Sequence, residues 1–137
     1  MRKIGLLGGM SWESTATYYK FINEGVRARL GGLASADILL RSLDFRQVVA
    51  LQKADRWDEA AALLARAAQG LQRAGADCLL ICTNTMHLVA DDVAYACDVP
   101  LIHIIDETAR AIRAKGLRRP LLLATRYTME HLSLIHI

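Results

Sequence analysis

Four short apolar runs, separated by longer segments of helical periodicity, constrain the fold of this chain more than any other feature. The runs cover residues 4–7, 37–43, 77–82 and 101–105. Segments with helical periodicity cover residues 12–30, 56–74, 86–95 and 107–114, and glycines follow three of them. Continuous apolar strands that alternate with helices are typical of a parallel sheet covered on both faces. The pattern predicts an α/β fold, a three-layer αβα sandwich with a parallel sheet.

Composition and charge exclude several classes of partner. The 137 residues are 53 % hydrophobic and carry a net charge of +3, and the basic cluster at residues 113–119 has no aromatic neighbours. No apolar run reaches the roughly 18 residues of a membrane span, and no cleavage site follows the apolar start. The three cysteines lack the paired spacing of metal ligands. We expect reduced cysteines in the cytoplasm, with no metal, no nucleic acid and no membrane as partners.

A change in pattern after Gly116 predicts a domain boundary. We expect an N-terminal α/β domain over residues 1–116, followed by the start of a second domain over residues 117–131, with a strand at 120–124. The last six residues, 132–137, match a translation of the transposon-end adapter of sequencing libraries. We therefore expect this tail to be foreign to the native protein, and we assign it no role.

Cys82 is the first candidate for chemistry, because it stands where the apolar run 77–82 gives way to a helix. Ligands of open α/β sheets bind at the carboxyl ends of the strands. A helix start favours the thiolate and lowers the pKa of a cysteine from its ordinary value of about 8.5. A small buried hydrophobe is the alternative, and position alone leaves both open. Cys78 and Cys97 are expected to be structural.

Thr83, Asn84 and Thr85 follow this cysteine directly. They could cap the next helix, or their hydroxyl, amide and backbone donors could hold a carboxylate. His87 falls in the first helical turn, where it either tunes the site or packs on the sheet. A glycine-rich turn at 5–15 lacks both G-x-G-x-x-G and a Walker lysine, so it gives little support for nucleotide binding.

Four motifs occur in one order and resemble the aspartate/glutamate racemase family, in particular its broad-specificity amino-acid racemase branch. They lie at residues 8–15 (GGMSWEST), 40–45 (LRSLDF), 82–87 (CTNTMH) and 125–129 (TRYTM). The resemblance covers nearly all of residues 1–130. It implies two similar α/β domains facing each other across a cleft, of which this chain holds the first and the start of the second.

The resemblance also implies a chemistry without pyridoxal phosphate or any other cofactor. One cysteine thiolate removes the α-proton of an amino acid, and an opposite thiol returns a proton to the other face. By resemblance, Cys82 is the first catalytic cysteine, Thr83, Asn84 and Thr85 hold the substrate carboxylate, and Met10 and Gln52 line the site. A pKa near ambient pH suits such a group, and donors near the carboxylate stabilise the carbanion.

Two departures from the family pattern matter. Ala124 stands where the family usually has glycine. The second cysteine, expected in a Gly-Cys-Thr segment of the second domain, is absent, and Cys97 is badly placed to replace it. We expect residues 1–137 alone to have no racemase activity, and the full-length protein to be an isomerase that can form homodimers.

Three alternatives stay open. A related decarboxylase or cis–trans isomerase of dicarboxylates would share this half of the protein. A non-catalytic module that binds carboxylates or amino acids would end naturally near residue 131, but it would leave the apolar strand at 120–124 without a partner sheet. A hydrolase with Cys82 as nucleophile is also conceivable, but the sequence offers no Asp–His pair at a telling spacing.

Overall fold

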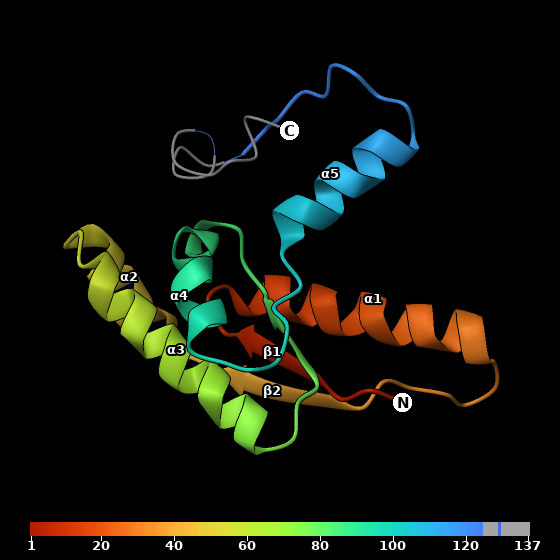
Figure 1. Ribbon diagram of the computed structural model, residues 1–137, viewed down its shortest axis with the longest axis horizontal. Coiled ribbons are helices and arrows are strands. Elements are labelled where there is room, and N and C mark those ends of the chain that lie inside the picture. The colour runs from red at the N-terminus through yellow and green to blue at the C-terminus, as the bar shows by residue number, and fades with distance from the viewer. Residues whose placement is uncertain (125–128, 130–137) are drawn as a thin grey trace.

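A computed structural model of the chain describes residues 1–124 and 129. Within residues 1–124, three strands and six helical segments follow one another (Figure 1). In order they are β1 (Ile4–Gly8), α1 (Trp12–Leu30), β2 (Ile38–Ser42), α2 (Phe45–Lys53), α3 (Trp57–Arg73), β3 (Cys78–Ile81), the 3₁₀ helix η1 (Thr85–Val89), α4 (Ala90–Tyr95) and α5 (Ile104–Ala114).

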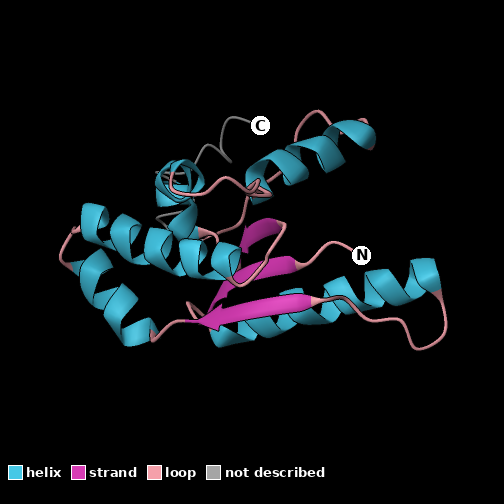
Figure 2. Ribbon diagram, turned by 60° about the horizontal axis from the view of Figure 1, so that its bottom comes forward, coloured by secondary structure: helices cyan, strands magenta, loops and turns pink. Residues whose placement is uncertain are grey.

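The strands form one parallel sheet with β1 between β2 and β3. Because side chains alternate across a strand, the odd-numbered residues Leu7, Leu79 and Ile81 enter the core shared with α3. Gly8 faces the other side, where a Cβ atom would lie 2.5 Å from Thr15 of α1. Helices therefore cover both faces of the sheet (Figure 2), and the predicted α/β fold with a parallel sheet is confirmed.

The predicted strand at 101–105 is wrong beyond its first residue. Leu101 forms an isolated parallel bridge with Leu79, and α5 begins at Ile104. The helix starts there because the His103 side chain accepts a hydrogen bond from the Ile105 N–H, at 3.2 Å. Ile105 and Ala109 are both buried, and their spacing of four residues places them on one face of the helix. The continuous apolar run at 101–105 does not show this helical spacing.

Two helical segments also differ from the sequence interpretation. The segment predicted as one helix at 86–95 is the 3₁₀ helix η1 followed by the short α4. Helix α2 was not predicted at all, although its N-cap Asp44 accepts a hydrogen bond from the Arg46 N–H at 2.9 Å. Its single fully buried side chain, Val48, leaves too weak an apolar period to indicate a helix.

The predicted strand at 120–124 is absent from the part of the chain that the structure describes. Leu121 and Leu123 are each 83 % exposed, and neither pairs with the sheet. The motif at residues 125–129 and the predicted tail lie outside the described residues, apart from Met129. The domain boundary near Gly116 stays a prediction. Within the described residues, no helix is both long enough and apolar enough to span a membrane.

Candidate functional site

The carboxyl ends of the three strands are tied together by main-chain hydrogen bonds. Leu43 N donates to Gly8 O and Cys82 N donates to Leu7 O, each at 2.9 Å. The residues that follow β1, β2 and β3 therefore meet at one edge of the sheet, where ligands of parallel α/β sheets bind.

Gly9 turns the chain at the end of β1, and no other residue fits there. Its φ angle is +83°, and a Cβ atom would lie 2.3 Å from the Leu43 carbonyl oxygen. Its N–H donates to the Thr15 hydroxyl at 3.0 Å, which in turn donates to the Ser11 carbonyl at 3.1 Å. Ser11 caps α1 by accepting from the Ser14 N–H at 3.4 Å. The glycine-rich segment thus serves as a tight strand-to-helix turn, the role expected for it on physical grounds.

Cys82 lies at this edge but is completely buried. Burial raises its pKa to about 12, because a thiolate loses its hydration there. The expected lowering of the pKa is therefore wrong for this structure. The following helix η1 has only five residues and begins at Thr85, so it offers little dipole to oppose the loss of solvation.

The loop at residues 83–85 is polar and partly accessible. Asn84 is exposed, whereas Thr83 and Thr85 are half-buried. Asn84 occupies the N-cap of η1 but makes no side-chain capping hydrogen bond. Among residues 1–124, the side chains of this loop have no hydrogen-bond partner that would commit them to a structural role.

His87 forms two hydrogen bonds to that loop. Its Nδ1 atom lies 2.8 Å from the Thr83 carbonyl oxygen, and its main-chain N–H donates to Asn84 O at 3.0 Å. Burial, helped by the neighbouring His103, lowers the His87 pKa to about 4, so the ring is neutral at pH 7. A neutral ring that faces a carbonyl through Nδ1 carries its proton on Nδ1 and donates it to Thr83. The two histidine rings meet edge to face with their centroids 4.6 Å apart.

Gln52 contacts Met86, which follows this loop directly, and Met10 belongs to the same buried cluster as Met86. Gln52 Nε2, on α2, donates to Met86 Sδ at 3.0 Å. Met10 is 2 % exposed and belongs to the same buried cluster as Met86 and Leu43. The fold thus gathers Met10, Gln52 and the loop around the strand ends, and their contact with a substrate stays a prediction.

Tyr18, which the sequence did not suggest, lines a hollow together with Leu80 and Ile81 of β3. Its hydroxyl is buried and has no hydrogen-bond partner among the described residues. Burial, and then the charge of a Cys82 thiolate, raise its pKa to about 12. The sequence signal is its position three residues after Thr15, on the face of α1 that meets the sheet.

Comparison with known proteins assigns the family. The family model for Asp/Glu/hydantoin racemases matches residues 7–133, and the chain belongs to this family. The chain is 27 % identical over 130 residues to the broad-specificity amino-acid racemase RacX of Bacillus subtilis, covering 93 % of this chain and 56 % of RacX. The resemblance inferred from the four motifs is confirmed.

Two solved structures share both sequence and fold with the chain. One is from a Yersinia pestis protein assigned as an Asp/Glu racemase, with a TM-score of 0.92 and 52 % identity, covering 98 % of this chain and 58 % of that one. The other is an aspartate racemase homologue from Pyrococcus horikoshii OT3, with a TM-score of 0.85 and 38 % identity, covering 94 % and 56 %. The chain therefore spans little more than half the length of these relatives.

Proposed function

We propose that the full-length protein is a cofactor-independent amino-acid racemase, in which Cys82 is one of two acid/base cysteines. The observation that carries the proposal is a buried thiol at the end of β3, followed directly by a polar loop with uncommitted side chains. Membership of the racemase family supports the reaction class. In this proposal Thr83, Asn84 and Thr85 bind the substrate carboxylate.

The protonation state of Cys82 favours one half of the reaction. With a pKa of about 12, the sulfur holds its proton at neutral pH. A base on the opposite side of the substrate would remove the α-proton and leave a carbanion. The Cys82 S–H bond would then break as its proton bonds to the α-carbon, leaving a thiolate. The reverse reaction would use that thiolate as the base, so burial of the protonated sulfur supports an acid role for Cys82 in the resting protein.

The full-length protein, read through its native frame beyond residue 131, allows the direct test. Exchange of the α-proton of aspartate and glutamate is followed by NMR in D₂O, together with the D/L ratio. We expect exchange and racemisation in the unaltered protein, loss of both in Cys82→Ser, and retention in Cys97→Ser. Full activity of Cys82→Ser would contradict the proposal.

The burial of Cys82 also favours a second function for the chain of 137 residues: amino-acid binding without turnover. A thiol that is fully buried and protonated cannot begin proton abstraction, whereas the polar loop can still bind a carboxylate. Titration of this chain with aspartate, followed by amide NMR shifts of residues 83–85, tests binding. We expect shifts without any change in the D/L ratio, and racemisation by this chain would contradict its predicted inactivity.

A further inference from the structure

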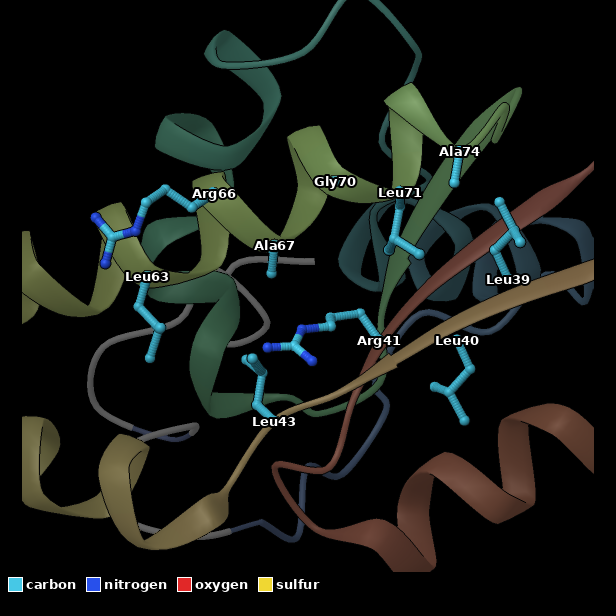
Figure 3. Close-up of a pocket in the computed structure, with 10 residues that line it drawn as sticks. All are labelled: Leu39, Leu40, Arg41, Leu43, Leu63, Arg66, Ala67, Gly70, Leu71 and Ala74. Carbon is cyan, nitrogen blue, oxygen red and sulfur yellow. The ribbon is translucent and has the colours of Figure 1, made fainter.

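Two histidine rings meet beside the loop at 83–85, and the proposed function gives neither of them a role. By contrast, the hollow between β2 and α3, with a volume of about 470 Å³, is lined mainly by apolar side chains (Figure 3). His87, in η1, is 5 % exposed, and His103, at the N-cap of α5, is half-buried. The planes of the two rings are inclined by 73°, and their centroids lie 4.6 Å apart. Burial of a polar ring costs free energy unless its polar atoms are paired, so each ring nitrogen matters.

One of the two ring nitrogens of His87 lacks a partner among the described residues. Nδ1 donates to Thr83 O at 2.8 Å, whereas Nε2 is buried without a hydrogen bond. The terminal torsion of a histidine is broad and roughly two-fold. A half-turn of the ring would put a carbon atom where Nδ1 lies and would break the bond to Thr83. Because Nε2 makes no hydrogen bond in the described chain, packing has to oppose that turn.

The ring of His103 supplies this packing. It meets His87 edge to face, which is an arrangement that aromatic pairs prefer. His103 is held in turn by α5, because its Nδ1 atom accepts a hydrogen bond from the Ile105 N–H at 3.2 Å. The ring that packs on His87 is therefore fixed to the start of a helix.

His87 holds the loop at two points of its main chain. The ring bonds to Thr83 O, and the His87 N–H donates to Asn84 O at 3.0 Å. Asn84 makes no side-chain capping bond, so the direction of its side chain depends on how this main chain is held. A change in the orientation of the His87 ring would free the Thr83 carbonyl and loosen the loop.

We propose that His103 is a positioning residue, whose ring fixes the orientation of His87 and thereby the main chain of the loop that receives the substrate carboxylate. The identity of the substrate rests on the proposed function, whereas the contact from His103 through His87 to the loop does not. In this proposal His103 touches no reacting atom, and the proton transfers stay with the two cysteines.

Two substitutions separate the ring of His103 from its cap. His103→Asn removes the ring and keeps a capping side chain for α5, because asparagine is among the best N-cap residues. His103→Phe keeps a ring that can pack edge to face and removes the cap bond. In the full-length protein, KM is measured for aspartate or glutamate, whichever the protein racemises.

We expect KM to rise roughly three- to tenfold in His103→Asn, as the strength of one edge-to-face contact implies, and by no more than about twofold in His103→Phe. The Phe variant should unfold at a lower urea concentration, because α5 loses its cap. A role limited to capping α5 predicts the reverse order of the two KM values, and that order would overturn the proposal.

A second measurement, on the 137-residue chain, needs no turnover. The nitrogen chemical shifts of the His87 ring report which atom carries the proton, and hydrogen exchange of the His87 amide reports its bond to Asn84 O. We expect the proton on Nδ1 and a protected amide in the unaltered chain and in His103→Phe. In His103→Asn the amide should exchange roughly three- to tenfold faster, and unchanged exchange would overturn the proposal.

The exchange measurement also separates this proposal from the proposed function. A full-length protein without racemase activity, combined with the expected exchange pattern, would contradict the proposed function and support the positioning of the loop by His103. Racemisation with an unaltered KM in His103→Asn would do the opposite.

A double variant tests whether His103 acts through His87. Once His87→Gln has removed the ring that His103 contacts, His103→Asn should raise KM no further, and additive effects would overturn the proposal. Arg66→Gln is the control for a surface change on another element, since Arg66 of α3 is exposed and points away from the hollow (Figure 3). It should leave both KM and the exchange of the His87 amide unchanged. Circular dichroism checks that each variant is folded.

Discussion

Replacement of Gly9 by alanine measures how closely β1 and β2 approach at the candidate site. The new Cβ atom would lie 2.3 Å from Leu43 O and 2.5 Å from Leu43 N, and the φ angle is +83°. A positive φ costs an alanine about 1–2 kcal/mol. Relief of the overlap requires a shift of roughly 1 Å at the end of β2, since carbon contacts relax near 3.5 Å.

That shift strains the core and breaks the hydrogen bond from Leu43 N to Gly8 O. Overpacking costs about 1–3 kcal/mol and the lost bond about 1 kcal/mol. Together the three contributions predict that Gly9→Ala lowers the free energy of unfolding by about 3–6 kcal/mol. This is a large part of the 5–15 kcal/mol typical of a folded domain.

Gly32 provides the matched control for this measurement. Its φ angle is +58°, but a Cβ atom there would meet nothing within 4 Å. Gly32→Ala therefore isolates the conformational cost, which we expect to be about 1 kcal/mol. Urea unfolding of both variants, followed by circular dichroism, gives the two free energies of unfolding. Equal losses in the two variants would refute the reasoning from close approach.

Three further outcomes are expected. Burial lowers the His87 pKa from 6.5 to about 4, so the unfolded chain binds a proton at His87 before the folded chain does. The contribution of neutral His87 to the free energy of unfolding is therefore full above pH 6.5, and about 3 kcal/mol is lost as the pH drops to 4. Urea unfolding of His87→Gln across that range should lack this loss, and the same pH dependence in that variant would contradict the assignment. The rate at which iodoacetamide alkylates Cys82, followed by peptide mass, should rise steadily from pH 7 to 10, because the pKa of Cys82 is about 12. A plateau in this rate below pH 9 would contradict that pKa and indicate a stabilised thiolate. Thr15→Val keeps the methyl group but leaves the buried Gly9 N–H without its acceptor, and it should cost about 1–3 kcal/mol in urea unfolding. Thr15→Ser keeps the acceptor and should cost less. A Thr15→Val variant as stable as the unaltered chain would contradict the role of the hydroxyl.

The sequence predicts the central strands of this fold better than it predicts the segment at 101–105. Runs such as 4–7 and 77–82 are short, continuous and flanked by strong helical patterns, so periodicity alone identifies them as buried strands. The run 101–105 looks the same but folds mostly as a helix. The deciding contact is a hydrogen bond from the Ile105 N–H to the His103 ring, which composition does not reveal.

For the candidate site, the sequence indicates which residues follow the strand but not their electrostatics. Cys82 and the loop at 83–85 stand out in the sequence because of their position after a strand. The pKa of Cys82 depends instead on how completely neighbouring side chains exclude water from the sulfur. Tyr18 was not identified for a related reason, because only the packing of α1 on the sheet brings it beside Leu80 and Ile81 of β3 and buries its hydroxyl.

The bonds from Cys82 N to Leu7 O and from Leu43 N to Gly8 O have a thermodynamic consequence for recognition. They hold the backbone at this edge of the sheet in place whether or not a ligand is present. In the proposed function, an amino acid that binds the loop at 83–85 would have to immobilise only side chains there, at about 0.5–1.5 kcal/mol for each rotamer-rich side chain. Isothermal calorimetry should accordingly record a small entropic penalty, characteristic of a preorganised receptor and unlike that of a segment that folds on binding.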